Sequence, residues 1–367
     1  MLLTRVSLSN VRNYARLDFE PAPGLNVFVG DNAQGKSNLL EAISMLGTGK
    51  SFRTNREADL VKTGLEIATI SGEARIAAGN IRLACTITAT SRGTRKLYAI
   101  NGEAVRYARF LGSVKVVTFV PGDLHLVTGP PAMRRSMLNV ALAQDQRSYY
   151  HELVRYQKAV AQKSALLRGI VPPDPSLLEI YNQTLVEAGS KIMLARAHLV
   201  AALERAAQHA HAGWTGGAER FGLQYVPNVP FDVPTDEAVA GAFETRLRER
   251  ADAEAARKAV LVGPHRDDVA LTLDGASLAA YGSQGQQRTA VLALKVGEYA
   301  VMHERSGEAP LLLLDDVLSE LDPSRAGAFF AGIGGYEQAF LTTTTLPASV
   351  AGAAAYRIAD AALQRIA

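Results

Sequence analysis

The sequence predicts an α/β protein with two lobes, a head with a mixed β-sheet lobe and an inserted, mainly helical arm lobe. Three observations support this fold class. Residues 25–29 read as a short apolar strand, and an amphipathic helix follows after a glycine-containing loop. Residues 311–314 form a second apolar run, typical of a parallel strand buried on both faces. The long stretch between the two runs contains Ala, Leu and charged residues with helical spacing.

The chain has 367 residues, which is enough for more than one lobe. Within the arm, helices at about 155–169 and 187–208 are separated by the stretch "IVPPDPS", and a charged helix at roughly 237–258 returns to the head. We expect three consecutive segments: the N-terminal part of the head at 1–143, the arm lobe at 144–258 and the C-terminal part of the head at 259–367.

The composition is that of an ordinary soluble protein, with 48% hydrophobic and 20% charged residues. The net charge is only +3, so any surface for nucleic acid must be local. No apolar run approaches the roughly twenty residues of a membrane span. Arg5 and Arg12 come too early for a signal-peptide core, and Cys85 is the only cysteine, which excludes an internal disulfide. We expect a cytoplasmic protein with no membrane partner.

The triplet Gly-Lys-Ser occurs twice, and only the first copy lies in a complete phosphate-loop pattern, G-x-x-x-x-G-K-[ST]. In "GLNVFVGDNAQGKS", Gly30 ends a strand and Gly35 allows the backbone to approach phosphate oxygens. Lys36 is expected to reach the β- and γ-phosphates, and Ser37 to bind Mg²⁺. The residues expected to contact the nucleotide in this loop are Gly30, Asp31, Asn32, Ala33, Gln34, Gly35, Lys36, Ser37 and Asn38.

The second triplet ends in Ser51 and fails the same test. Ser44 stands where the first glycine of the pattern should be, and an amphipathic helix precedes it instead of a strand. Lys50, Arg53 and Arg56 form a short basic run there. This run is either a solvated helix exit or a surface that meets an anion such as a nucleic-acid backbone.

The apolar run at 311–314 ends in two acidic residues, which supply the second half of a nucleotide site. Asp315 can hold Mg²⁺ through water at the end of a buried strand. Asp316 stands where a general base or water-orienting carboxylate would lie. We therefore expect ATP and Mg²⁺ as cofactors, with Lys36 and Asp316 as the catalytic residues.

A third segment, "YGSQGQQRTAVLALK", predicts a helix that begins with a capping box of Ser283 and Gln286. The free N–H groups, the hydroxyl and the flexible Gly285 make this helix start an anion site without a lysine. The alternative is an ordinary capped helix.

These residues carry a resemblance. "SQGQQ" resembles the signature motif of the ABC ATPase superfamily, and "SELD" (319–322) resembles its D-loop. The resemblance implies an ATP-dependent homodimer, in which each ATP is held between the phosphate loop of one subunit and the signature helix of the other. Ser283, Gly285 and Gln286 would then address the γ-phosphate held by Lys36 of the partner.

Longer stretches are similar to the RecF family of bacterial recombination mediators, an SMC-like branch of that superfamily. They include the N-terminal "NVRNY…GKSNLLEAI" segment, "GPPAMRRSMLNVALAQ" (129–144), "GPHRDD" (263–268) and "LLLLDDVLSELDPSR", in the same order over residues 2–346. The fold implied is an ABC/SMC-type P-loop ATPase head with an inserted arm.

The resemblance also implies a function. It implies an ATP-gated head dimer that clamps double-stranded DNA near single-strand gaps and helps to load RecA together with RecO and RecR. The setting would be the SOS response and replication-fork maintenance. The activity implied is a weak, DNA-dependent ATPase whose slow hydrolysis resets the clamp.

The chain departs from the family or superfamily pattern at several positions. Gly122 replaces a Glu, and Asn139 replaces an Asp. Asp316 stands for the superfamily's Glu, as is general in the family, and Thr replaces the switch His after "QAFLTTTT". The last two changes fit slow hydrolysis. Asp123 is our candidate for the missing Q-loop glutamine.

Two motifs have alternative interpretations. "NVRNY" is either a strand packed on the sheet or, as the resemblance implies, places Arg12 and Asn13 beside the nucleotide. "GPHRDD" is either a charged turn or a contact of His265 or Arg266 with DNA or the dimer seam. Candidate DNA contacts are Lys50, Arg53, Arg56, Arg134 and Arg135, and further candidates are Arg92, Arg95 and Lys96.

Three functions compete: the ATP-gated DNA-binding module, a transporter ATPase subunit, and an SMC-like tether. The "NVRNY" strand, the inserted arm and the missing switch His argue against the transporter. The arm is too short for a long coiled coil and has no sustained heptads, which argues against the tether.

Overall fold

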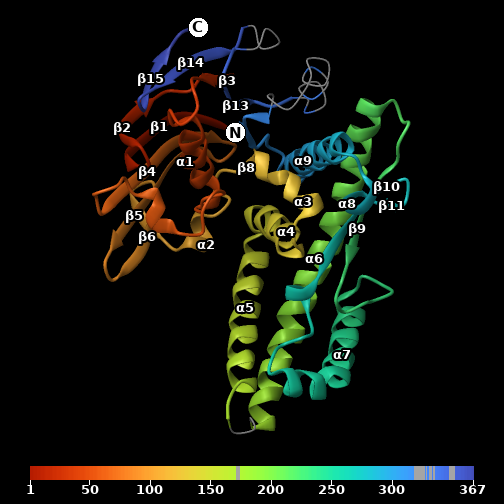
Figure 1. Ribbon diagram of the computed structural model, residues 1–367. Coiled ribbons are helices and arrows are strands. Elements are labelled where there is room, and N and C mark those ends of the chain that lie inside the picture. Colours follow the sequence, from red (N-terminus) through yellow and green to blue (C-terminus); the bar gives the residue numbers. More distant parts are fainter. Residues whose placement is uncertain (171–173, 318–326, 328, 330–332, 334, 347–351) are drawn as a thin grey trace.

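The computed structural model describes residues 1–170, 174–317, 327, 329, 333, 335–346 and 352–367 (Figure 1). Two β-sheets and a central helix form the head, and a bundle of long helices extends from it as the arm (Figure 1). The fold class expected from the sequence, an α/β head with a mainly helical arm, is confirmed.

One sheet of the head has six strands in the order β15-β14-β3-β13-β12-β8. All neighbours in it are parallel except β14 and β15. Val27 on one face of the central strand β3, and Asn26 and Phe28 on the other, are fully buried, so the strand is covered on both faces. The strands are β3 (Gly24–Val29), β8 (Val116–Phe119), β12 (Leu311–Asp315), β13 (Gln338–Thr343), β14 (Ala354–Ala359) and β15 (Ala362–Arg365).

The other six-stranded sheet is antiparallel, in the order β2-β1-β4-β5-β6-β7. Helix α1 (Lys36–Thr48) contacts strands of both sheets. It is therefore buried almost all round, where its sequence predicted a single buried face. The strands are β1 (Leu2–Val11), β2 (Tyr14–Phe19), β4 (Ile67–Ile76), β5 (Gly79–Thr90), β6 (Gly93–Ile100) and β7 (Glu103–Val105).

The arm is built from α5 (Arg147–Leu167), α6 (Pro175–Thr215) and α7 (Asp236–Arg257). Helix α6 has 41 residues and is longer than the sequence spacing predicted. Asp174 caps it by accepting a hydrogen bond from the Ser176 backbone N–H at 2.9 Å, and Pro175 occupies its first turn. The end of "IVPPDPS" thus begins a helix, because proline is tolerated at that position.

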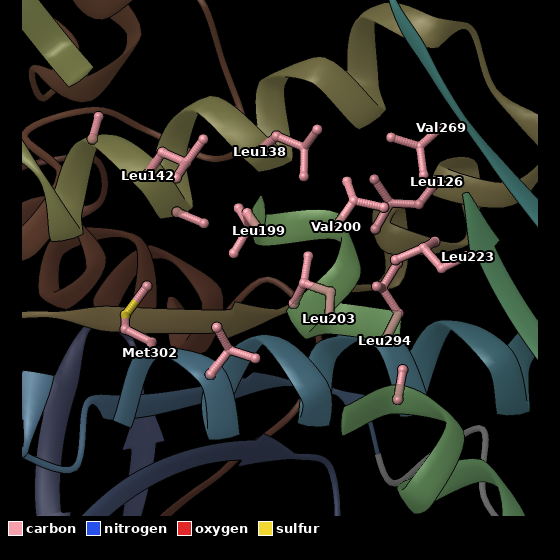
Figure 2. Close-up of a cluster of buried hydrophobic side chains, with 14 of the residues drawn as sticks. Leu126, Leu138, Leu142, Leu199, Val200, Leu203, Leu223, Val269, Leu294 and Met302 are labelled. Atoms are coloured by element: carbon pink, nitrogen blue, oxygen red, sulfur yellow. The ribbon is translucent and has the colours of Figure 1, made fainter. Parts of the chain in front are cut away.

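The arm joins the head through a hydrophobic core shared by several elements. Side chains of α4 (Pro131–Asp145), α6 and α9 (Gln284–Ser306) point toward one another there, with strands β9 (Phe221–Val226) and β10 (Asp268–Leu273) at one side (Figure 2). β10 pairs with β9 and with the short β11 (Ala276–Ser277). The remaining short helices are η1 (Glu57–Leu60), α2 (Tyr107–Phe110), η2 (Pro121–Leu124), α3 (His125–Thr128), η3 (Pro264–Arg266) and α8 (Leu278–Tyr281).

Among the described residues, no helix has the length and apolar character needed to cross a bilayer.

Candidate nucleotide-binding site

The loop between β3 and α1 has the backbone geometry of a phosphate-binding turn. A Cβ on Gly30 would lie 2.2 Å from the Ile358 carbonyl oxygen, so strand β14 leaves room only for glycine. Gly35 has a φ of 112°, which side chains rarely adopt, and it directly precedes the first turn of α1. The N-terminal N–H groups of α1 therefore open toward the loop, where an anion is stabilised.

Residues at the turn between β1 and β2 form hydrogen bonds with this loop. Asn13 donates from Nδ2 to the Gln34 carbonyl at 3.2 Å and accepts from Asn38 at 2.8 Å. The Tyr14 hydroxyl donates to the Gly35 carbonyl at 3.1 Å. Burial raises the pKa of Tyr14, so its hydroxyl stays protonated as a donor. "NVRNY" thus fixes the loop through Asn13 and Tyr14, and sequence reasoning missed the part played by Tyr14.

Lys36 lies inside the loop. Its Nζ donates to the carbonyl oxygens of Gly30 at 2.6 Å and Asp31 at 2.8 Å, and the residue is 8% exposed. Burial lowers the pKa of Lys36, while nearby carboxylates, Asp316 first, act in the opposite direction. The ammonium group is held by weak neutral acceptors that phosphate oxygens would replace.

Ser37 and Asp315 meet at the start of α1. Ser37 Oγ donates to Asp315 Oδ1 at 2.7 Å, and Asp315 is 7% exposed. Thr342 Oγ1, at the end of the neighbouring strand β13, donates to the same carboxylate oxygen at 2.8 Å. Hydroxyl and carboxylate oxygens are the ligands that Mg²⁺ prefers, so these residues fit that ion. Thr342 was not predicted, although a hydroxyl at the end of the adjacent parallel strand was visible in the sequence.

Asp316 follows with a φ of 54°, a left-handed conformation that is uncommon for residues other than glycine. Its backbone N–H donates to Thr342 Oγ1 at 2.9 Å, so one threonine supports both acidic residues. Asp316 lines a pocket together with Asp123 and Arg288. Burial raises the pKa of the Asp123 carboxyl, which accepts the Val120 N–H at 2.9 Å.

The capping box expected at the start of α9 is confirmed. Ser283 Oγ accepts the Gln286 N–H at 3.2 Å, and Gln286 Oε1 accepts the Ser283 N–H at 2.8 Å. Gly285 is exposed, and among the described residues only Ser283 Oγ, at 4.0 Å, lies near the position of a Cβ there. The "SELD" stretch at 319–322 lies outside the described residues.

The whole chain matches known proteins in sequence and in structure. A family model described as the RecF/RecN/SMC N terminal domain matches residues 2–360. The DNA replication and repair protein RecF of Symbiobacterium thermophilum is 43% identical over 351 residues, covering 94% of this chain and 92% of that protein. The chain belongs to the RecF family. RecF of Staphylococcus aureus is also similar, with 37% identity over 94% of each chain.

Solved structures give the same result. The recombination mediator protein RecF of the RecFOR pathway, solved with ATP, is similar with a TM-score of 0.92 and 30% identity, over 100% of this chain and 98% of that one. An SMC head bound to the C-winged helix domain of ScpA is similar with a TM-score of 0.56 at 15% identity over 97% of its chain, which shows the fold alone. The RecF-family chain therefore has an SMC-like head.

In this RecF-family chain, Arg12 does not turn toward the phosphate loop. Its guanidinium donates to both Glu41 oxygens, at 2.8 and 2.7 Å, and to the Asp59 carbonyl at 2.8 Å. Glu41 is fully buried and also accepts from the Ser51 hydroxyl. A contact of Arg12 with a nucleotide stays a prediction, whereas its role in neutralising Glu41 is visible.

The second Gly-Lys-Ser ends a helix. Gly49 caps α1 with a φ of 62°, and its N–H donates to the Met45 carbonyl at 2.9 Å. Lys50 is exposed, with Nζ 5.7 Å from the centre of the Tyr107 ring. Ser51 closes the turn by accepting the N–H groups of two following residues. Each residue of the triplet therefore has a structural role away from the phosphate loop.

The structure disfavours the expected DNA contact of Arg134, because its side chain is held inside the fold. Its Nε and Nη2 donate to Asp268 at 2.6 and 2.9 Å, and its Nη1 donates to the carbonyls of Leu126 and Gly129. The side chain is 10% exposed, because Arg134 faces Asp268 at the start of β10 and not solvent. Arg135 is partly buried and donates to the Asp267 carbonyl at 2.6 Å, so its DNA contact stays a prediction.

Three other candidate DNA contacts lie at the surface after α1. Arg56 has 85% of its side chain exposed, and Arg53 has 42% exposed while bonding to Asn38 at 2.5 Å. Lys50 is exposed beside them in sequence. These three residues can reach an outside anion, and their contact with DNA stays a prediction.

"GPHRDD" forms a turn into β10, as one interpretation predicted. Asp267 and His265 point inward, whereas Arg266 is exposed and its contact with DNA or the dimer seam stays a prediction. Asp267 is 1% exposed and accepts from Arg196 at 2.9 Å and from the Asn228 N–H at 2.8 Å. His265 Nδ1 lies 2.6 Å from the Tyr156 hydroxyl. The motif thus joins the arm helices to the head, which disfavours His265 as a DNA contact.

Proposed function

We propose that this RecF-family chain is an ATP-dependent DNA-binding protein of recombinational repair. The observation that carries the proposal is the convergence of Lys36, Ser37 and Asp315 at the start of α1. The likeness to a RecF structure solved with ATP over the full chain length supports the same assignment.

In the proposed site, bound ATP supplies a phosphoanhydride and Mg²⁺ supplies a Lewis acid. Lys36 would bind the terminal phosphates in place of the loop carbonyls, and the N–H groups of α1 would bind phosphate oxygens. Ser37 and Asp315 would hold the metal, and Thr342 fixes the Asp315 carboxylate. Asp316 would orient the attacking water.

The weak hydrolysis that we propose follows from two side chains. Asp316 is one methylene shorter than a glutamate, so its reach toward a water is reduced. A threonine hydroxyl at the end of β13 can donate a hydrogen bond to phosphate but carries no titratable proton near neutral pH. Hydrolysis then acts as a slow switch that resets the ATP-bound state.

Ser283, Gly285 and Gln286 form an exposed helix start that bonds within itself and to Glu219, with no partner from the phosphate loop among the described residues. We infer that these residues complete the nucleotide site of a second copy, giving an ATP-dependent homodimer. Its closed form would clamp double-stranded DNA, including gapped DNA, through phosphate contacts of Lys50, Arg53 and Arg56. The RecFOR pathway named for the solved relative supports RecO and RecR as partners, and the outcome that we propose with them is RecA loading.

The deciding experiment measures fluorescence anisotropy of a labelled DNA duplex with Mg-ATP, with Mg-ADP and without nucleotide, each over a salt series. Tight binding with ATP alone, weakening steeply with salt, supports the clamp. Lys36→Ala is the matched control, because it should lose the ATP-dependent part only. DNA binding of equal strength in all three nucleotide states, or no DNA binding in any of them, would overturn the proposal.

A further inference from the structure

The loop between α6 and β9 passes over the start of α9 and contacts the signature motif. Glu219 in this loop accepts a hydrogen bond from Gln286 Nε2 through Oε1, at 2.8 Å. Its side chain is 27% exposed, so solvent reaches the carboxylate only partly. The contact joins two segments that are 67 positions apart in the chain.

Glu219 determines which way the Gln286 amide points. A carboxylate only accepts hydrogen bonds, so the NH₂ group of Gln286 must face Glu219. The amide oxygen then faces the Ser283 N–H, which donates to it at 2.8 Å. With the amide reversed, two oxygens would face each other at Glu219, and the NH₂ group would face the N–H donor of Ser283.

The same capping box also engages the hydroxyl oxygen of Ser283. Ser283 Oγ accepts the Gln286 backbone N–H at 3.2 Å, which uses a lone pair of the oxygen. The hydroxyl hydrogen therefore remains available for an acceptor outside the capping box. An anion approaching the start of α9 would meet that O–H together with the first N–H groups of the helix.

Glu219 is anchored on both sides of its loop. After it, the Arg220 N–H donates to Asp274 Oδ1 at 2.8 Å and the Asp274 N–H donates to the Arg220 carbonyl at 2.9 Å. Before it, His211 in the last turns of α6 is fully buried and lies 3.9 Å from Glu219 Oε2. Burial lowers the pKa of His211, so the imidazole is neutral near pH 7. It therefore does not form an ion pair with Glu219, whose carboxylate accepts the hydrogen bond from Gln286.

Helices α6 and α9 are packed tightly below this contact. A Cβ on Gly297 would lie 3.0 Å from the Ala207 backbone nitrogen, so the two backbones approach closely. Leu199 and Leu203 of α6 face Leu294 and Met302 of α9 in the shared core (Figure 2). Helices α6 and α9 therefore form one packed unit, and the hydrogen bond between Glu219 and Gln286 links the loop after α6 to the start of α9.

We propose that Glu219 is a positioning residue for the signature motif: through Gln286 it holds Ser283 in the orientation that binds the γ-phosphate of a nucleotide on a second copy. The inference rests on the proposed ATP-dependent homodimer. In a two-fold symmetric dimer the contact would occur twice, once in each nucleotide site.

The test compares single variants of the full-length chain in sedimentation velocity with Mg-ATP. Glu219→Ala should weaken dimerisation about tenfold per site, hence about a hundredfold in the dimer constant, because a bond to a charged group is lost. Glu219→Gln should recover most of it, since its amide oxygen can accept the same bond. Glu187→Ala is the matched control, because Glu187 pairs with Arg155 on the arm surface.

A charge exchange tests the orientation itself. Gln286→Glu alone places two carboxylates against each other and should weaken dimerisation. Adding Glu219→Gln should restore it, because the amide introduced at position 219 can then donate to the carboxylate introduced at position 286, which still accepts the Ser283 N–H. Titration of each variant with a fluorescent ATP analogue should give the parent affinity, since the phosphate loop is untouched.

Two results would overturn the inference. If Glu219→Ala dimerises like the parent while Ser283→Arg does not, the homodimer stands and the role of Glu219 is wrong. If the parent binds ATP but stays monomeric, the proposed homodimer fails and the inference fails with it.

Discussion

Ser37 and Asp315 lie 278 positions apart in the chain, and their side-chain oxygens lie 2.7 Å apart. The contact exists because β3 and β12 both pair with β13 as parallel strands, so their carboxyl ends share one edge of the sheet. It brings the hydroxyl that follows the phosphate loop to the carboxylate that ends the buried strand. The fold itself thus brings together the two halves of the predicted magnesium site.

The two Gly-Lys-Ser triplets can be separated by one pair of substitutions. Ser37→Ala should weaken Mg-ATP binding about 10- to 100-fold, as expected when an oxygen at a metal site is removed. Ser51→Ala should leave the affinity unchanged and lower the free energy of unfolding by about 1 kcal/mol, because its bond to Glu41 is lost. Isothermal titration calorimetry and urea denaturation measure the two effects. Equal losses of affinity in both variants would contradict the assignment.

Ser283→Arg should separate ATP binding from dimerisation. The arginine fills the exposed helix start and blocks an approaching phosphate loop, while the variant's own loop stays intact. We expect parent-like affinity for a fluorescent ATP analogue and no dimer in light scattering with Mg-ATP. A normal dimer of this variant would disprove the shared nucleotide site.

Arg134 and Arg56 should behave in opposite ways. Arg134→Met leaves Asp268 without its partner and should cost about 2–3 kcal/mol of stability, toward the low end for a buried pair because Asp268 is 33% exposed. Arg56→Ala should leave stability unchanged, since its contact with Asp59 is exposed and 3.8 Å long. It should instead weaken DNA binding and reduce the salt slope by about one. Denaturant curves and DNA titrations of both variants give the comparison.

Stability should fall as the pH drops below 6.5, the ordinary pKa of histidine. Burial lowers the pKa of His265 and of His211 in the folded chain, so below pH 6.5 the unfolded chain binds more protons. Each histidine contributes a slope of up to about 1.4 kcal/mol per pH unit until the pH reaches its folded pKa. Above pH 6.5 both histidines are neutral in the folded and the unfolded chain, so their contribution to the slope of stability against pH vanishes.

His265→Gln isolates one part of this dependence. The glutamine has no titration in the range, so the loss of stability between pH 7.5 and 5.5 should be smaller than in the parent. Urea denaturation at both pH values provides the measurement. The same loss in parent and variant would show that His265 does not titrate as its burial implies.

Several parts of the site could be predicted because their chemistry is local in sequence. The phosphate loop is one continuous stretch, and its glycines, lysine and serine must follow one another at fixed spacing. The capping box needs only Ser283 and Gln286, three positions apart, and it formed as expected. The strand before Asp315 was recognisable because a strand buried on both faces has to be apolar throughout.

Other features could not be predicted, since their partners are distant in sequence. Nothing near Arg134 in the sequence indicates that Asp268 neutralises it, so the sequence presents Arg134 as a candidate DNA contact. Arg12 likewise pairs with Glu41, which the spacing of α1 presented only as part of a helix. Thr342 became visible as a support of Asp315 only when β13 was placed beside β12.

The sequence by itself determined the phosphate loop, the buried strand with its acids, the capped signature helix and the helical arm, because each depends on residue types at short, regular spacing. The tertiary structure decided which of these meet. Sheet pairing placed Ser37 against Asp315, and the end of the arm helix placed Glu219 against Gln286. A hydrogen bond needs atoms within about 3 Å, and only the folded backbone brings residues that are dozens or hundreds of positions apart to that distance.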